Sequence, residues 1–230
     1  MRVTALLLAF VALASCEEWR TLFDGKSLEG WRVEAKAVDR EKGFWSVAGG
    51  SIQADSIGRN DHDYVWLIRD GEFADFELQL KVRDFPQSRG NSGIQIRSRW
   101  DPQAQWLHGP QVDVHPPAPW RSGLIYDETQ EARRWIHPSL PDWKIDASQG
   151  PALWKWRLGE WNDVRIFCRG GHITTTVNDV VITDADLSDV LFDEAHRRHQ
   201  VGRSGQIALQ LHTRDELKIQ YKDIRIRTLP

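Results

Sequence analysis

Two segments of the sequence, 90–99 and 110–115, alternate aliphatic side chains with polar side chains suited to acid–base chemistry. The polar members are Gln95, Arg97, Arg99, Gln111, Asp113 and His115. Successive side chains of a β-strand point to opposite faces, so each segment should place its polar members on one face of a sheet. A carboxylate and an imidazole can transfer protons, and a guanidinium can stabilise negative charge on an oxygen. The pattern therefore predicts a polar sheet face that binds a polar substrate or reacts with it.

Tryptophan is the unusual feature of the composition, because the chain has 12 tryptophans among its 230 residues. Several lie in polar, Pro-rich stretches where a core position is not expected, namely Trp100, Trp106, Trp120, Trp135 and Trp143. A flat aromatic surface in a loop can stack on the apolar face of a sugar ring. The tryptophans and the polar strand face together favour a carbohydrate ligand.

Period-two patterns recur along the chain and predict that short antiparallel strands hold these residues. Phe76–Arg83 and Ile207–His212 alternate cleanly, and the second places Gln210 and His212 opposite its leucines. The pair Asn178-Asp179 is typical of a hairpin turn. We expect an all-β fold, a two-sheet antiparallel sandwich. Long Trp- and Pro-rich loops are expected between residues 100 and 161, and one or two short helices within residues 184–198.

Residues 1–16 are predicted to be a signal peptide with a lipobox, and residues 17–230 a single domain. Arg2 precedes a short apolar run that ends in Leu13-Ala14-Ser15-Cys16, which is typical of an export signal and too short to span a bilayer. These last four residues resemble the bacterial lipobox, in which the cysteine is lipidated. Cys16 is therefore expected to anchor an exported protein to a bacterial membrane, in the periplasm or at the cell surface. A plain signal peptide with a chance cysteine is the alternative.

The second cysteine, Cys168, lies on the apolar face of the alternating segment 164–168. If Cys16 carries a lipid, Cys168 has no disulfide partner, although the compartment would allow a disulfide. We expect Cys168 to be a small core residue and not a nucleophile.

Charge gives no reason to expect a nucleic-acid partner. The chain has 30 Lys and Arg against 33 Asp and Glu, a net charge of −3, and no basic stripe. The run His196–His199 is too short for such a patch and is expected to be a solvated charge cluster. His108, His115 and His137 lie in Pro-rich stretches and are expected at the surface.

Several motifs, in order along the chain, resemble the 3-keto-disaccharide hydrolase family, formerly a domain of unknown function. They are LFDGKSLEGW at 22–31, FEL at 76–78, NSGI at 91–94 followed by Arg97, GLIY at 123–126, WN at 161–162 followed by Asn178, GQIALQLH at 205–212 and YKDIRI at 221–226. Each motif alone is weak, but the order and spacing are specific and cover about residues 22–229. The resemblance implies a concanavalin-A-like jelly roll that acts on glycosides oxidised to a ketone at carbon 3. An oxidoreductase that dehydrogenates carbon 3 would then act upstream.

A ketone at carbon 3 acidifies the hydrogen on carbon 2, so the implied reaction is elimination of the substituent on carbon 1 followed by addition of water. Asp113 is the first candidate for the base and Glu128 the second. Arg97 is expected to contact the ketone or enolate oxygen, unless it merely pairs with Asp113 across the strands. His212 or Tyr126 is expected to protonate the leaving group.

The remaining candidates are expected to bind the sugar. Gln95, Gln111 and Gln210 would hold its hydroxyls, and Asn91, Glu77, Trp106 and Trp120 would also line the groove. One departure from the family leaves the acid–base assignment open, because members often carry Glu-x-Gln where this chain has Gln111-Val112-Asp113. The same residues argue against a conventional glycosidase, which needs two carboxylates across the scissile bond.

A divalent metal ion is an open alternative to Arg97, and no cofactor is firmly predicted. Asp113, His115, Glu128 and His212 supply suitable ligand types, but their separations follow no known metal-binding spacing.

A non-catalytic carbohydrate-binding module of lectin type is the alternative function, because lectins use the same sandwich. Loop tryptophans serve both functions equally well. The carboxylate and the histidine expected near Arg97 favour an enzyme, since binding a neutral sugar needs no acid–base pair.

Overall fold

The alternating apolar residues of the segment 76–83 form the inner face of strand β6 (Phe76–Asp84), where Phe76, Leu78, Leu80 and Val82 are all buried. Ile94, on strand β7 (Ser92–Asp101), is buried in the same hydrophobic core. Each large aliphatic side chain that is fully buried contributes about 1.5–3 kcal/mol to folding. The core therefore forms between two sheets, one built around β6 and the other around β7.

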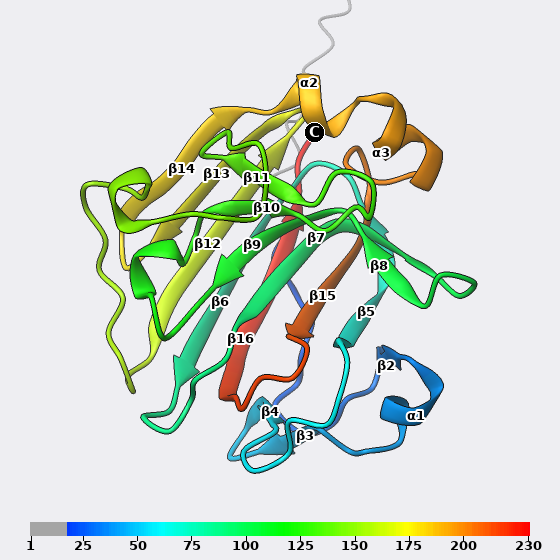
Figure 1. Ribbon diagram of the computed structural model, residues 1–230, viewed down its shortest axis with the longest axis vertical. Coiled ribbons are helices and arrows are strands. Elements are labelled where there is room, and N and C mark those ends of the chain that lie inside the picture. The colour runs from blue at the N-terminus through cyan, green and yellow to red at the C-terminus, as the bar shows by residue number, and fades with distance from the viewer. Residues whose placement is uncertain (1–17) are drawn as a thin grey trace, which may run out of the picture.

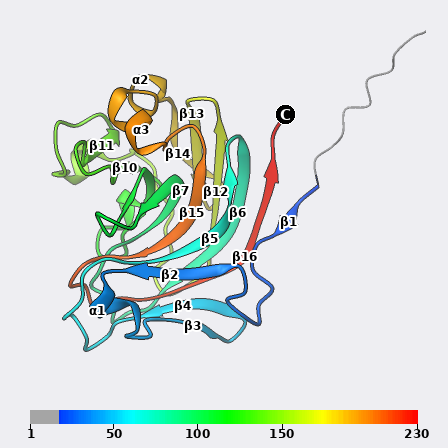
Figure 2. The ribbon, with the colours of Figure 1, turned by 90° about the vertical axis from the view of Figure 1, so that its right-hand side faces the viewer.

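The computed structural model describes residues 18–230 as two antiparallel eight-stranded sheets in two packed layers (Figure 1, Figure 2). The β6 sheet has the order β14 (Val180–Asp186), β13 (His172–Val177), β12 (Asn162–Arg169), β6, β16 (Lys218–Thr228), β4 (Ser51–Asp55) and β3 (Trp45–Ala48), with β1 (Arg20–Thr21) beside β16. The β7 sheet has the order β11 (Arg134–His137), β10 (Ile125–Asp127), β9 (Pro110–Val114), β7, β15 (Gly205–Leu211), β5 (Val65–Phe73) and β2 (Trp31–Ala35), with β8 (Trp106–His108) beside β7. The predicted jelly-roll sandwich is confirmed.

Helices are short and lie at the edges of the sandwich. They are α1 (Ala37–Arg40), α2 (Ser188–Leu191), α3 (Glu194–His199) and the 3₁₀ turns η1 (Pro119–Arg121) and η2 (Ala147–Gln149). Within residues 18–230, none is long and apolar enough to cross a membrane. Helices α2 and α3 confirm the helical signal expected within 184–198. The hairpin β13–β14 turns at Asn178 and Asp179, whose φ angles of 49° and 65° are left-handed as the sequence predicted.

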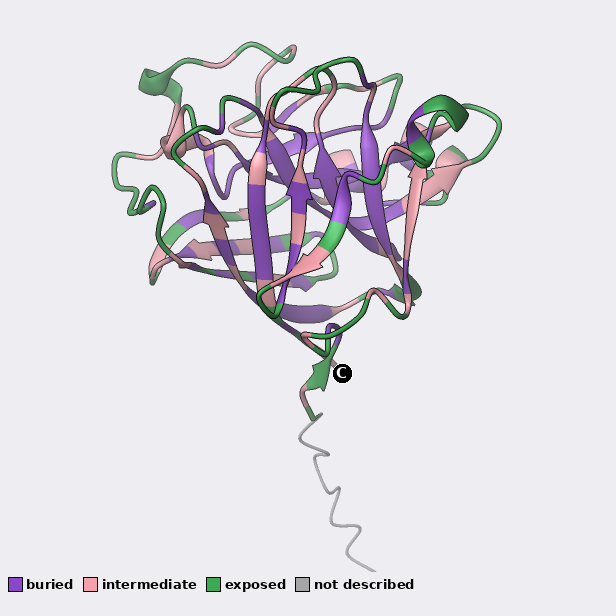
Figure 3. Cartoon of the chain, turned by 90° about the horizontal axis from the view of Figure 1, so that it is seen from below, coloured by how far each residue is buried: buried purple, intermediate pink, exposed green. Residues whose placement is uncertain are grey.

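The Trp- and Pro-rich region is partly regular. It contains β8 to β11, and residues 138–161 then run without a strand until β12 begins. Buried residues concentrate in the strands, and exposed ones in the connecting loops (Figure 3). Trp135, expected in a loop, lies on β11 and is only 1% exposed, so it is a core residue. Cys168 is buried in the core with a free thiol, as predicted. The predictions for Cys16 lie outside the described residues.

Two histidines expected at the surface are buried instead. His108 is 1% exposed, because the β7–β8 hairpin folds back over a small cluster of apolar residues on the outer face of the β7 sheet. His196 is fully buried on α3, with Nε2 3.4 Å from Asp127 Oδ2 and Nδ1 2.9 Å from Asp193 Oδ1. The run that begins at His196 is therefore not wholly a solvated cluster.

A β-bulge interrupts β7 at the residue expected to contact the ketone. Gln95 pairs with Ala208 and Ser98 pairs with Gln206, so the two residues Ile96 and Arg97 lie opposite the single residue Ile207. Arg97 takes the left-handed φ of 48°. An extra residue in one strand reverses the alternation beyond it. Arg97 therefore does not share the outer face of Gln95.

Arg97 is a buried structural residue, which corrects the prediction of a catalytic contact. Its side chain is fully buried and donates to the backbone carbonyls of Ala74 (2.6 Å), Gly170 (2.5 Å) and Gly202 (3.1 Å) and to Asp75 Oδ1 (2.9 Å). It does not pair with Asp113 either. The guanidinium thus ties three separate loops together at one end of the sandwich.

Replacing Arg97 with Met should reduce the free energy of unfolding by about 3–5 kcal/mol, because three buried carbonyls lose a charged donor. Arg99→Met is the matched control on the same strand, since Arg99 forms a partly exposed pair with Glu72 (2.8 Å) and should cost about 0.2–1 kcal/mol. Urea denaturation followed by tryptophan fluorescence measures both. Equal losses in the two variants would contradict the structural role of Arg97.

Candidate active site

Polar residues of β9 and β10 meet on the outer face of the β7 sheet, as the alternation predicted. Gln111 pairs with Tyr126 on one side and with Gln95 on the other, while the intervening Val112 and Ile125 point into the core. A cleft of about 440 Å³ opens over this face. The residues that line it include Tyr64, Asn91, Gln111, Asp113, His115, Tyr126, Glu128, Arg133, Trp143, Lys144, His212 and Asp215.

Glu128 is a buried acid of the cleft with an incomplete set of partners. Its side chain is 3% exposed, and Oε1 accepts a hydrogen bond from Gln210 Nε2 at 2.9 Å. Oε2 has no hydrogen bond among the described residues, and Arg133 Nε lies 4.0 Å from it. Burial raises the pKa of the Glu128 carboxyl, against the opposing effects of the Gln210 hydrogen bond and the Arg133 charge. A carboxylate that resists ionisation and has one free oxygen is a strong candidate for a proton acceptor.

His212 belongs to a chain of polar contacts that crosses the cleft. Tyr64 Oη lies 3.0 Å from His212 Nε2 and accepts a hydrogen bond from Arg133 Nη2 at 3.2 Å. On its other side, His212 Nδ1 lies 3.0 Å from Asp215 Oδ2, an ion-pair contact whose angle falls outside hydrogen-bond geometry. Burial favours a raised pKa for Asp215, but His212 and the backbone N–H of Asn91 outweigh it and lower that pKa. The arrangement places a histidine within hydrogen-bond distance of the Tyr64 hydroxyl in the cleft.

Asp113 is also in the cleft, but its charge is already paired. Arg121 Nε donates to Asp113 Oδ2 at 3.1 Å, and Arg121 Nη2 lies 3.4 Å from Oδ1. The Asp113 side chain is 1% exposed. Glu128 therefore replaces Asp113 as the better candidate for the base, because Arg121 contacts both Asp113 oxygens, whereas Glu128 Oε2 accepts no hydrogen bond from the described residues.

Two glutamines expected to bind sugar hydroxyls lie behind the cleft floor. Gln95 and Gln210 are both fully buried, and Gln95 Nε2 donates to Gln111 Oε1 at 3.1 Å. Gly93 leaves space for this packing, because a Cβ there would lie 2.1 Å from Gln111 Cδ. Gln95 thus orients Gln111, and Gln210 orients Glu128. Gln111 and Asn91 are the two amides that reach the cleft.

The remaining predicted residues lie away from the cleft lining. Glu77 is buried on the outer face of the β6 sheet, where Arg227 and Arg165 pair with it, near a separate hollow of about 820 Å³ that contains no predicted site residue. Trp106 packs against Tyr64 and donates Nε1 to the Glu128 carbonyl at 2.7 Å, so it supports the site from behind. Trp120 packs against the core beside Gly150.

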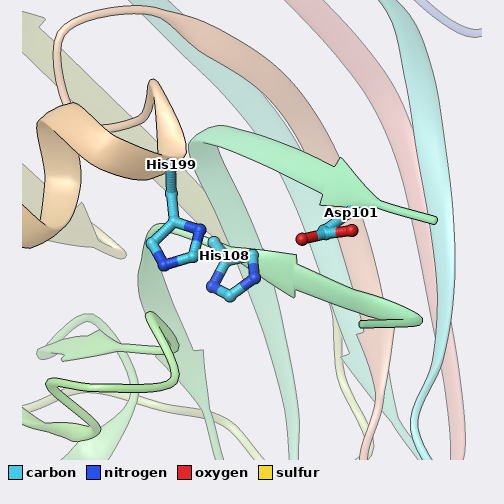
Figure 4. Close-up of side chains that lie close together, drawn as sticks. All are labelled: Asp101, His108 and His199. Carbon is cyan, nitrogen blue, oxygen red and sulfur yellow. The ribbon is translucent and has the colours of Figure 1, made fainter. Parts of the chain in front are cut away.

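The predicted metal ligands are not spaced to hold an ion. Within the described part of the chain, the one group of three or more His, Cys, Asp or Glu side chains close enough to share a metal is Asp101, His108 and His199 (Figure 4). Asp113, Glu128 and His212 line one cleft without forming such a group. His115, which also lines the cleft, accepts a hydrogen bond from Ala118 N at its Nδ1 (2.9 Å), and burial lowers its pKa.

The sequence analysis did not identify several residues of the cleft, among them Tyr64, Arg133 and Asp215, and it named Trp143 only as one of the loop tryptophans. Tyr64 shares the outer face with Trp66 and Ile68, a period-two signal that was available in the sequence. Arg133 and Trp143 lie in irregular segments, and Asp215 lies in the loop after β15, so no strand pattern could place them. Trp143 is 67% exposed at the edge of the cleft, which suits a stacking surface for a sugar.

The sequence model of the 3-keto-alpha-glucoside-1,2-lyase-like domain matches residues 18–227, nearly all of the described chain. No curated protein matches the chain.

Solved structures support the fold. A proposed glycosyl hydrolase from Parabacteroides distasonis ATCC 8503 superposes with a TM-score of 0.60 at 16% identity, covering 92% of this chain and 94% of that one. A second from the same organism gives 0.56 at 22% identity, covering 92% and 100%. The carbohydrate-binding module CBM66 from Bacillus subtilis gives 0.51 at 14% identity, covering 86% and 96%. At these identities the likeness shows the fold alone.

Replacing Arg133 with Gln should raise the pKa of Glu128 further, because the cation that favours the ionised carboxylate is removed. Carboxyl ¹³C NMR on glutamate-labelled protein can follow this titration, with the Glu128 signal assigned by its loss in Glu128→Gln. Arg89→Gln, which removes a cation elsewhere on the cleft, is the control and should leave the midpoint in place. An unchanged titration midpoint of Glu128 in Arg133→Gln would contradict the electrostatic coupling between the two side chains.

Proposed function

The chain belongs to the 3-keto-α-glucoside-1,2-lyase-like family, and we propose that it cleaves glycosides that carry a ketone at carbon 3. The observation that carries the proposal is Glu128, a buried carboxylate with a raised pKa and one oxygen without a hydrogen bond among the described residues, in a cleft beside a guanidinium. A base poised in this way suits removal of a weakly acidic proton next to a carbonyl group. The ketone itself must come from an oxidoreductase that dehydrogenates carbon 3 upstream.

The first step is proton transfer from carbon 2 to Glu128 Oε2. The C–H electron pair becomes the carbon 2–carbon 3 double bond, and negative charge collects on the carbon 3 oxygen. Arg133 takes the role first assigned to Arg97, because its guanidinium is the cation nearest to Glu128 and faces the cleft. A fixed positive charge beside the enolate oxygen lowers the barrier to forming it.

In the second step the enolate expels the substituent on carbon 1. The ketone re-forms, a carbon 1–carbon 2 double bond appears, and the departing oxygen takes a proton from the His212–Tyr64 pair. Tyr126 is the other candidate acid. Burial raises the pKa of both tyrosines, that of Tyr126 to about 12, but Tyr64 is the one whose hydroxyl lies 3.0 Å from His212 Nε2, which can resupply its proton. Water then adds across the new double bond, with hydroxyl at carbon 1 and hydrogen at carbon 2, which completes a net hydrolysis.

Glu128→Gln should lower kcat/KM on a 3-keto-disaccharide by about 100- to 10,000-fold, because the amide keeps the shape of the side chain but cannot accept the proton. In the wild-type chain, kcat/KM should rise with pH through the raised pKa of Glu128, since only the ionised carboxylate is a base. Chromatographic detection of the released sugar measures both quantities.

Glu72→Gln is the control, because Glu72 is an exposed acid paired with Arg99 away from the cleft. This variant should keep the activity of the wild-type protein. Asp113→Asn should lower activity because Arg121 loses its charged partner. The rise of kcat/KM with pH should remain, because it depends on Glu128. Folded wild-type protein without turnover on any 3-keto-glycoside would reject the enzyme.

A non-catalytic carbohydrate-binding module is the second candidate, favoured by the exposed indole of Trp143 at the cleft edge. The resemblance of its fold to a known binding module agrees with that candidate. A module would bind sugar saturably without product, lose binding in Trp143→Ala and keep it in Glu128→Gln. The buried acid and the His212 contacts have no use in such a protein, so we favour the enzyme.

Export with a lipid anchor at Cys16 is also part of the proposal, and it rests on the sequence of residues 13–16. Metabolic labelling with a fatty acid in a bacterial host should mark the wild-type chain and leave Cys16→Ala unlabelled. Cys168→Ala is the control and should remain labelled. Equal labelling of the wild-type chain and Cys16→Ala would contradict the anchor.

A further inference from the structure

Three side chains from different elements meet beside the cleft. Asp101 ends β7, His108 ends β8 and His199 ends α3, about 90 residues further along the chain. One nitrogen or oxygen atom from each lies within 4.8 Å of the others. Figure 4 shows the His108 ring between His199 and Asp101, with the carboxylate directed toward the rings.

His108 carries an unmet polar atom in this cluster. The residue is 1% exposed, yet its Nε2 has no hydrogen-bond partner among residues 18–230. A buried polar atom without a partner costs about 1–3 kcal/mol and needs a physical reason.

We propose that Asp101, His108 and His199 bind a zinc ion, independently of the proposed reaction. Two imidazole nitrogens and one carboxylate oxygen are ligands that Zn²⁺ favours, and Glu131 stands next to them, with Oε2 2.8 Å from His199 Nε2. Asp101 Oδ1 accepts hydrogen bonds from the backbone N–H groups of Gln103 (2.8 Å) and Ala104 (3.1 Å), which fixes the carboxylate.

Zinc binding requires a change at each of the two rings. The imidazoles stack 3.7 Å apart at 14°, so one ring must turn before both lone pairs reach one ion, and His199, with a side chain 17% exposed, is the ring nearer the surface. Ligation through His108 Nε2 places the ring proton on Nδ1. The hydrogen bond that Gln130 N donates to that Nδ1, at 3.4 Å, must then be given up.

The ion would tie the β7–β8 hairpin to α3, next to the segment that carries Glu128. Glu128 N donates to the carbonyl of Gly109, the residue after His108, at 3.0 Å. Zinc at this position would be a structural ion outside the cleft, and it would not act as a Lewis acid on the substrate.

Chelator-stripped full-length protein, titrated with Zn²⁺ against a chromophoric chelator, should bind one ion per chain and show a higher melting temperature. His199→Gln and Asp101→Asn should each lower the affinity by more than the 10- to 100-fold that losing an outer partner of a ligand typically costs. His172→Gln is the matched control, because His172 also pairs with a carboxylate, Asp184 at 2.7 Å, but on the other sheet. Circular dichroism checks that each variant is folded.

The site is overturned if the folded wild-type chain binds no Zn²⁺, or if His199→Gln and Asp101→Asn bind it as tightly as His172→Gln does. Sugar release by zinc-free protein would leave this test untouched, so failure of the metal site and failure of the proposed enzyme remain distinguishable.

Discussion

The buried carboxylate of Glu128 is the constraint on which the rest of the site depends. Desolvation opposes its charge, and a buried acid is tolerated only where partners limit that cost. Gln210, itself fully buried, holds one oxygen, and Arg133 stands at ion-pair range of the other. Trp106 fixes the backbone at the same residue. Each partner comes from a different segment, so the closed sandwich is needed to assemble them.

The outer faces of the two sheets differ in how far their polar groups are satisfied. The outer face of the β6 sheet carries compensated charges such as the buried Glu77, which pairs with Arg165 and Arg227. The outer face of the β7 sheet leaves hydrogen-bonding capacity unused at Glu128 Oε2 and Asn91 Oδ1. Unsatisfied polar atoms lower stability, and a protein that keeps several of them in one cleft gains from them when a polar ligand binds. This difference separates the candidate site from the larger hollow on the other sheet.

The fold and the candidate site were predictable to different degrees. Period-two alternation correctly placed Gln111, Asp113 and His212, because the rows of a regular antiparallel strand depend only on residue spacing. Arg97 was placed on the wrong face for the same reason: the bulge adds one residue to β7, and no local signal marks it. Gln95 and Gln210 lie on the expected strands, but other side chains cover them. They hydrogen-bond Gln111 and Glu128 and do not reach a sugar in the cleft.

The sequence alone determined that this chain folds as a two-sheet sandwich with a polar outer row, and its ordered motifs identified the family. The sandwich and its polar row follow from the local alternation of residues, which is visible in the sequence without any long-range contact. Only the tertiary structure decided that Arg121 holds the buried Asp113 while the buried Glu128 keeps an oxygen without a hydrogen bond, and that Tyr64, Arg133 and Asp215 complete the cleft. Burial and charge pairing depend on residues far apart in the chain, and they set the chemistry of a carboxylate more strongly than its type does.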